Sequence, residues 1–311
     1  EMGTFAHRVL EVTHRDLFLA ASRKAGLVGE DAAERPEGSL FWFDPSVRVP
    51  GSRVDEDTLA KATDMLVAEF DEHLEHQRLE GNVRSKQALI PHGQAEQRKL
   101  DELKRDLVDT LAYESTRFKG FEPRLFEGRF GGTSGLAATY AGADLVGTID
   151  RIDVNERGQA LVIDYKHKSS LFEEYALSPR GEQDFAAGFR LPRRVQTLVY
   201  ASVARNLLRG SGVEVVGAVY LGTRGNHQIA GAVSARDIDA VWAARDLRAS
   251  EVERVSLPVP GARTFDELLD RTEEKIAEAI DDMRAGVIDA RPIAKDACNW
   301  CPVLDCERRL S

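Results

Sequence analysis

The sequence of 311 residues predicts an α/β protein in which helices flank a central mixed β-sheet. Three observations lead to this prediction. Apolar residues recur at helical spacing through residue 118, the period changes to that of strands between residues 121 and 166, and a further helix and apolar strand follow. The length, with 42% hydrophobic and 30% charged residues, is sufficient for a sizeable core.

The first part of the chain is expected to be helical. Apolar positions predict helices over residues 3–25, 56–80 and 94–118. Gly, Pro, Asp and Glu dominate residues 26–51, which predicts an irregular stretch. We therefore expect residues 26–92 to form a mostly helical insertion with an irregular beginning.

The second part is expected to alternate between strands and helices. Strands are predicted over residues 121–130, 144–154, 159–166 and 213–221. Pro192 suits the first position of a helix that runs to about residue 208. Thr264 and Glu267 form a capping box for a last helix to about residue 285.

Composition and motifs exclude several classes of protein. No apolar run is long enough to span a bilayer and no signal-peptide pattern opens the chain, so we expect a cytoplasmic protein. The formal net charge of −10 argues against nonspecific nucleic-acid binding through bulk charge, although a local surface can still hold DNA. No glycine-rich phosphate loop of the G-x-x-x-x-G-K-[ST] type is present, which argues against ATP hydrolysis.

Charged residues end two strands that a turn connects. Asp164 and Lys166 are two residues apart, so their side chains project from one face of a strand. If residues 156–158 form a three-residue hairpin loop with a left-handed glycine, counting back sets Asp150 directly opposite Asp164. Asp153 competes with Asp150 but lies an odd number of residues away, which points it to the other face.

Two converging carboxylates beside a lysine suit the hydrolysis of a phosphodiester. A divalent cation with oxygen ligands would lower the pKa of the attacking water and offset the charge of the pentavalent phosphate. The lysine would orient the water or stabilise the phosphorane. The alternative from these residues alone is a surface hairpin on which Asp164 and Lys166 form an exposed ion pair.

In these segments the chain resembles the PD-(D/E)XK nucleases, specifically their RecB/AddB-like exonuclease branch. The resemblance covers nearly the whole chain, and its motifs occur in the family's order. They are Gly3–Glu11 for the opening helix, Phe121–Pro123 with Glu127 and Phe130–Gly131 for the first strand, Gly147–Asp150 and Ile163–Lys166 for the two acidic motifs, Gln196–Tyr200 for the Q-x-x-x-Y helix, and Cys298, Cys301 and Cys306 for an iron–sulfur staple.

The resemblance implies a restriction-endonuclease-like core and a role for each matching residue. His7, Asp150, Asp164 and the Tyr165 carbonyl would bind Mg²⁺ or Mn²⁺, and Lys166 would be the catalytic lysine. Further site residues follow from the same motifs. Gln196 and Tyr200 would support the site or touch DNA, and Glu127 is a weaker candidate. Without the resemblance, His7 would be a structural histidine, and Gln196 and Tyr200 an ordinary polar edge of a packed helix.

The domain organisation follows from the same resemblance. We expect one nuclease domain over residues 1–311, with a catalytic core at 94–222 and a C-terminal helix and cysteine tail at 264–311. A [4Fe–4S] cluster needs four thiolates, whereas the chain has three cysteines. In the resembling family the fourth lies upstream of the histidine motif, so we expect the chain to be a fragment of a larger protein. A three-cysteine zinc site and free thiols are the alternatives.

Basic residues near the expected site could hold a phosphate backbone. They are Lys168, Arg190, Arg193 and Arg194, and residues 171–191 are expected to form a mobile loop over the DNA path. The leading hypothesis is an Mg²⁺-dependent exonuclease domain of a helicase–nuclease that processes double-strand breaks with a helicase domain or partner subunit. The alternatives are a stand-alone CRISPR-associated RecB-like nuclease, a non-catalytic DNA-binding or scaffolding module, and a zinc-dependent binding protein.

Overall fold

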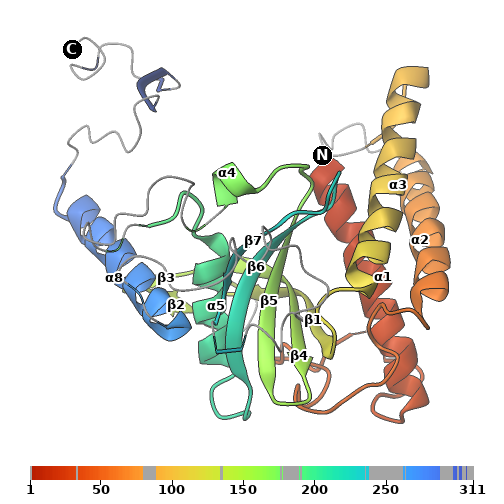
Figure 1. Ribbon diagram of the computed structural model, residues 1–311, viewed down its shortest axis with the longest axis horizontal. Helices are drawn as coiled ribbons and strands as arrows, with labels where there is room; N and C mark the ends of the chain where they lie inside the picture. The colour runs from red at the N-terminus through yellow and green to blue at the C-terminus, as the bar shows by residue number, and fades with distance from the viewer. Residues whose placement is uncertain are drawn as a thin grey trace.

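The computed structural model describes residues 2–32, 34–79, 89–133, 136–175, 177, 189, 191–234, 236–237, 262, 264–287, 297–299, 301–302 and 306 (Figure 1). Its helices are α1 (Met2–Lys24), α2 (Leu59–Leu79), α3 (Gln94–Ser115), α4 (Phe172–Tyr175), α5 (Gln196–Leu207) and α8 (Phe265–Arg284), with a 3₁₀ turn at Ala297–Asn299. Its strands are β1 (Phe121–Phe130), β2 (Thr139–Tyr140), β3 (Ala143–Asp144), β4 (Gly147–Asn155), β5 (Gln159–Lys166), β6 (Glu214–Gly222) and β7 (Ile229–Val233). Within this described part, no helix combines the length and the apolar character that a membrane crossing requires.

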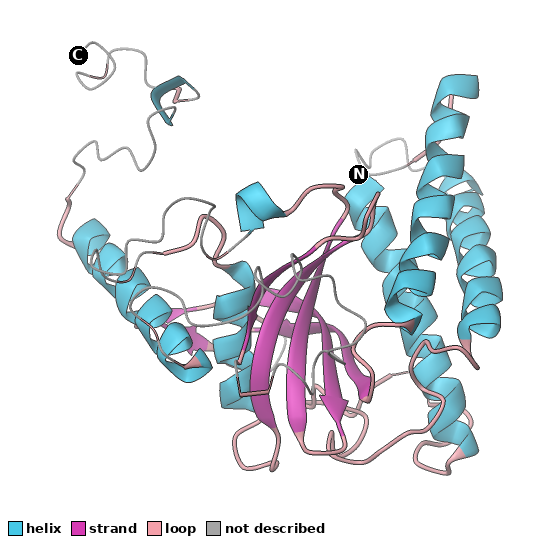
Figure 2. Cartoon of the chain, in the orientation of Figure 1, coloured by secondary structure: helices cyan, strands magenta, loops and turns pink. Residues whose placement is uncertain are grey.

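The central sheet is mixed, as the sequence predicts. Its strand order is β1–β4–β5–β6–β7. Figure 2 shows the strands in magenta at the centre of the chain, between helices in cyan. β5 and β6 run parallel, while the other neighbours in this sheet run antiparallel. Parallel neighbours need a crossover, and α5 lies in the connection between β5 and β6. β2 and β3 form a separate two-stranded ribbon.

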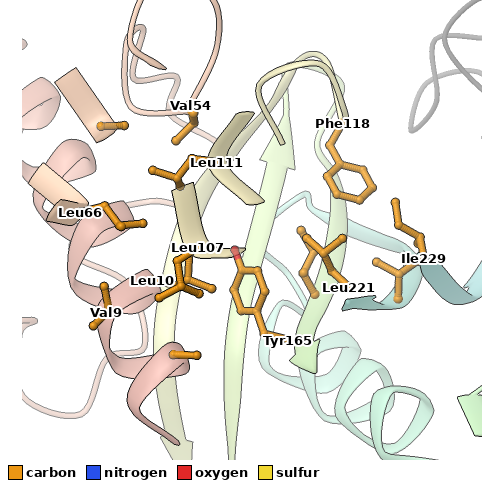
Figure 3. Close-up of a cluster of buried hydrophobic side chains, with 14 of the residues drawn as sticks. Val9, Leu10, Val54, Leu66, Leu107, Leu111, Phe118, Tyr165, Leu221 and Ile229 are labelled. Atoms are coloured by element: carbon orange, nitrogen blue, oxygen red, sulfur yellow. The ribbon is translucent and has the colours of Figure 1, made fainter. Parts of the chain in front are cut away.

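Helices cover both faces of the central sheet. α1, α2 and α3 lie on one side, and α5 and α8 lie on the other (Figure 1). Figure 3 shows the first interface, where Tyr165 of β5 packs with Leu10 of α1 and Leu107 of α3. In the second interface, Leu198 of α5 and Leu268 of α8 pack in one cluster with side chains from the opposite face of the sheet. Because both faces are covered, β5 carries an uninterrupted run of buried apolar residues.

Two strands differ from the sequence prediction. The strand expected over residues 144–154 is divided, since β3 ends at Asp144 and β4 begins at Gly147. The interruption lets the Leu145 N–H donate to the Ala138 carbonyl at 2.9 Å, which extends the β2–β3 ribbon. β7 was not predicted at all. Its five residues are all buried, and so short an apolar run has no period that identifies a strand.

The helix predicted from Pro192 begins four residues later, at Gln196. The Thr197 N–H, one of the first-turn donors that have no partner within a helix, donates to the Tyr220 hydroxyl at 3.1 Å. The helix therefore begins where its first turn contacts β6, and the local sequence of the helix does not reveal this contact.

The irregular segment between α1 and α2 covers the outer edge of β1. Arg124 donates to the Val47 carbonyl at 2.7 Å, and Arg35 donates to the Phe126 carbonyl at 3.3 Å. Edge strands with unpaired backbone groups are prone to pair with other chains, so this covering protects the sheet. α2 is also integral to the fold, because Phe70 is part of the main hydrophobic core.

Candidate active site

The β4–β5 hairpin brings the two predicted aspartates side by side. Gly158 adopts the left-handed conformation (φ 70°) in the turn, as the three-residue loop requires. Arg151 pairs with Ile163, so the next residues outward along the two strands, Asp150 and Asp164, lie opposite each other. The register is therefore the one that hairpin counting predicts.

Beyond the Arg151–Ile163 pair, the Asp150 side chain joins β4 to β5 in place of a backbone hydrogen bond. The Tyr165 N–H donates to Asp150 Oδ2 at 2.9 Å. His7 Nδ1 of α1 lies 3.3 Å from the same oxygen. His7, Asp150 and the backbone of Tyr165 thus converge at one end of the sheet.

Lys166 lies on the same face of β5 as Asp164 and is held from two sides. Its Nζ is 2.5 Å from Asp164 Oδ2 and donates to Gln196 Oε1 at 3.1 Å. Gln196 in turn donates to the Tyr200 hydroxyl at 3.2 Å. The structure therefore brings together the aspartate, the lysine and both residues of the Q-x-x-x-Y helix.

Burial makes ionisation of the carboxyl groups in this site unfavourable. It raises the pKa of Asp150 to about 6. Burial and the neighbouring Asp150 together raise the pKa of Asp164 to about 7. Burial also lowers the pKa of His7, which favours the neutral imidazole that can bind a metal.

Glu127, the weaker candidate from the sequence, is close to the centre of the site. Among the described residues, only His7, Glu127 and Asp150 bring three ligand atoms of His, Cys, Asp or Glu within 4.8 Å of one another. Asp164 is not part of this group, and its carboxylate is paired with Lys166. Burial and the charge of Asp150 raise the pKa of Glu127 to about 7.

The donor set fits a hard divalent cation. One imidazole and several carboxylates offer the nitrogen and oxygen ligands that Mn²⁺ and Mg²⁺ accept. Asp164 is 1% exposed, and its Oδ1 makes no hydrogen bond to the described residues. A buried carboxylate oxygen without a partner is costly, and a bound cation nearby would remove that cost.

A buried ionic network lies behind the site, on the other face of β4 and β5, and sequence reasoning missed it. Arg151 donates to both oxygens of Asp153 at 2.6 and 2.5 Å, to Glu114 of α3 at 2.6 Å and to the Tyr165 hydroxyl at 2.6 Å. His14 of α1 lies 3.1 Å from both Arg151 and Glu114. The spacing of Arg151 and Asp153 was the available signal, since residues two apart share a face of a strand.

The predicted basic residues lie beyond the end of β5. Lys168 and Arg194 both form ion pairs with Glu174 of α4. Arg193 is exposed on the segment before α5, and Arg190 lies outside the described residues. Most of the loop expected over residues 171–191 also lies outside them.

The cysteine tail is described only at isolated positions. Cys298, Cys301 and Cys306 form no disulfide within the described part of the chain. Three thiolates are one fewer than a [4Fe–4S] cluster requires, so the described residues do not make a complete cluster site.

Comparison with known proteins agrees with the geometry of the site. The family model of the PD-(D/E)XK nuclease superfamily matches residues 1–306. No curated protein matches the chain. The family match spans nearly the whole sequence, including the helix that carries His7 and both strands that carry the aspartates. The chain belongs to the PD-(D/E)XK nuclease superfamily.

Proposed function

We propose that the chain is a divalent-cation-dependent DNA exonuclease, the nuclease part of a RecB/AddB-type helicase–nuclease. Membership of the superfamily implies hydrolysis of phosphodiester bonds with DNA as the substrate, and such nucleases generally use Mg²⁺ or Mn²⁺. The observation that carries the proposal is the convergence of His7, Asp150 and Asp164 beside Lys166 at one end of the sheet.

In this proposal, four groups hold the cation: His7, Asp150, Asp164 and the Tyr165 carbonyl. When bound, a divalent cation supplies Lewis-acid stabilisation of the phosphate and lowers the pKa of water. The protein supplies fixed positions, because the Tyr165 N–H and His7 hold Asp150 from two directions. A carboxylate held in this way needs little reorganisation when the ion arrives.

Lys166 is the proposed catalytic lysine. Gln196 and Asp164 direct its ammonium group, which can then donate to a phosphate oxygen or orient the attacking water. Tyr200 holds Gln196 through its hydroxyl, so it acts on the lysine through the glutamine. The lysine also lies over the Tyr220 ring at 5.6 Å, and this contact further restricts its position.

The exonuclease activity, the partner and the biological role rest on the ordered motifs of the RecB/AddB-like branch. An attached helicase domain or partner subunit would feed one strand of unwound DNA to the site during double-strand-break repair and recombination in the cytoplasm. Lys168 and Arg194 are suitably charged to contact the phosphates of that strand.

The experiment compares cleavage of labelled linear and circular single-stranded DNA in Mg²⁺. We expect degradation of the linear DNA alone, because an exonuclease needs an end. Asp164→Ala and Lys166→Ala should each lower the rate by roughly 100- to 1,000-fold or more. The matched controls are Asp144→Ala at an exposed position on β3 and Lys275→Ala at a partly exposed position on α8, which remove the same charges away from the site.

Each part of the proposal has an outcome that contradicts it. Full activity of both site variants would remove the proposed site. Cleavage of the circular DNA would contradict the exonuclease assignment but not the nuclease. Metal binding without any cleavage would favour a non-catalytic DNA-binding module.

A further inference from the structure

A third acidic residue lies in line with Asp150 and Asp164 on the neighbouring strand. β1 and β4 pair Phe126 with Arg151 and Gly128 with Ile149, which sets Glu127 opposite Asp150. The acids of β1, β4 and β5 therefore form one row across three strands.

The backbone at Glu127 has a conformation that a side chain disfavours. Its φ of 44° is in the left-handed region, inside a strand where glycine would adopt it freely. The half-buried Arg35 lies over the Trp42 ring and donates to the Phe126 carbonyl at 3.3 Å, beside the strained residue. A strained residue that its surroundings hold in place is typical of a functional position.

The Glu127 carboxylate differs from that of Glu11 in the same pocket. Glu11 accepts from Arg8 at 2.7 Å and from Arg15 at 2.9 Å, so both of its oxygens are neutralised. The Glu127 carboxylate makes no hydrogen bond or ion pair with the residues that the structure describes, and it lies within ligand distance of His7 and Asp150.

The charge of the row also favours a cation. The three carboxyl groups lie together, and Lys166 is the ammonium group that pairs with one of them, Asp164. A divalent cation among them would favour their ionised form and balance their charge. A second observation points the same way: Asp164, opposite Asp150, is 1% exposed and its Oδ1 has no hydrogen-bond partner within the described residues.

We propose that Glu127 is a ligand of the divalent cation, so that the metal site spans β1, β4 and β5 and the first helix. The proposal rests on the proposed nuclease function and extends its metal site by one residue. Mg²⁺ or Mn²⁺ is the expected ion, because carboxylate oxygens dominate the ligand set.

The test measures Mn²⁺ binding to the full chain by titration calorimetry without DNA. Glu127→Gln should weaken Mn²⁺ binding by about tenfold or more. Glu11→Gln, the matched control, removes the same charge from the same pocket and should change the affinity by no more than about threefold, because its oxygens already have partners. An equal loss in both variants would mean that only the local charge matters, and would overturn the proposal.

Glu127→Gly keeps the test informative if the glutamine variant folds poorly. Glycine removes the ligand and relieves the left-handed strain, so we expect a higher melting temperature together with weaker Mn²⁺ binding. Wild-type Mn²⁺ affinity in either variant would overturn the proposal. DNA cleavage by the wild type but not by Asp164→Ala would show that the proposed nuclease function holds. Together with that cleavage result, wild-type Mn²⁺ affinity in the Glu127 variants would then remove only the role of Glu127.

Discussion

Replacement of Arg151 by Met should destabilise the protein severely, because this guanidinium is the centre of the buried network. It donates two bonds to Asp153 and one each to Glu114 and the Tyr165 hydroxyl. The Met variant leaves Asp153 (0% exposed) and Glu114 (3% exposed) as buried carboxylates without their cation.

Removal of one partner of a buried ion pair costs about 3–5 kcal/mol. The total stability of a typical protein is about 5–15 kcal/mol, so this loss is a large fraction of it. At about 2 °C per kcal/mol, the melting temperature should fall by roughly 6–10 °C. Arg157→Met is the matched control, since Arg157 is exposed at the turn of the same hairpin and should change stability by less than about 0.5 kcal/mol.

Urea denaturation of both variants at pH 5 and pH 8 would test the physical cause. In the wild type, Arg151 and His14 hold the pKa of Glu114 well below its usual range, so its contribution persists at both pH values and is lost only in strong acid. Without Arg151, the pKa of Glu114 should rise above that of the unfolded chain, because burial then outweighs the remaining charge of His14. The deficit should then be smaller at pH 5, where a proton neutralises the Glu114 carboxylate. A deficit below about 1 kcal/mol, or one that does not change with pH, would refute the reasoning.

Three further predictions concern the metal, the DNA and the hairpin. Burial raises the pKa of Glu127 to about 7, so protons compete with the cation for this carboxylate. The affinity for Mn²⁺ should therefore rise at least about tenfold from pH 6 to pH 8. Calorimetry that finds the same affinity at both pH values would contradict this. Lys168→Ala and Arg194→Ala, each in the Asp164→Ala background, should weaken single-stranded DNA binding measured by fluorescence anisotropy. Each should also reduce the steepness of the plot of log K against the logarithm of the salt concentration by about 0.7. An unchanged slope would mean that the residue contacts no phosphate. Gly158→Ala should cost at least about 1–2 kcal/mol, because its φ is 70° and because the added Cβ would lie 2.7 Å from the Gly212 carbonyl oxygen. An unchanged melting temperature would contradict this prediction.

The centre of the fold and of the site could be predicted because its rules are local. Side chains alternate along a strand, and a left-handed glycine fixes the loop length of a hairpin. These two rules are enough to place Asp150 opposite Asp164, with Lys166 beside them. They also direct Asp153 to the other face, where it pairs with Arg151.

The features that the sequence could not reveal depend on contacts between distant segments. The first-strand motif names Glu127 as a weaker candidate, but nothing in its neighbours predicts the left-handed conformation that it adopts inside β1. The start of α5 coincides with a contact to the Tyr220 hydroxyl of β6. The buried network needs Glu114 of α3 and His14 of α1 to meet Arg151, and their long separation in the sequence hides that meeting.

The network and the proposed metal site are two faces of the same strands. Alternation places Asp150 on one face and its neighbour Arg151 on the other. On the network face the carboxylates have cationic partners, whereas on the site face Glu127 and one oxygen of Asp164 have none among the described residues. His14 of the network and His7 of the site are about two turns apart on α1, so the contacts that anchor His14 also hold His7 against Asp150. The ion pairs on the network face thus stabilise the strands that hold the acidic groups of the site face together. On the site face, the protein's own groups do not neutralise those acids.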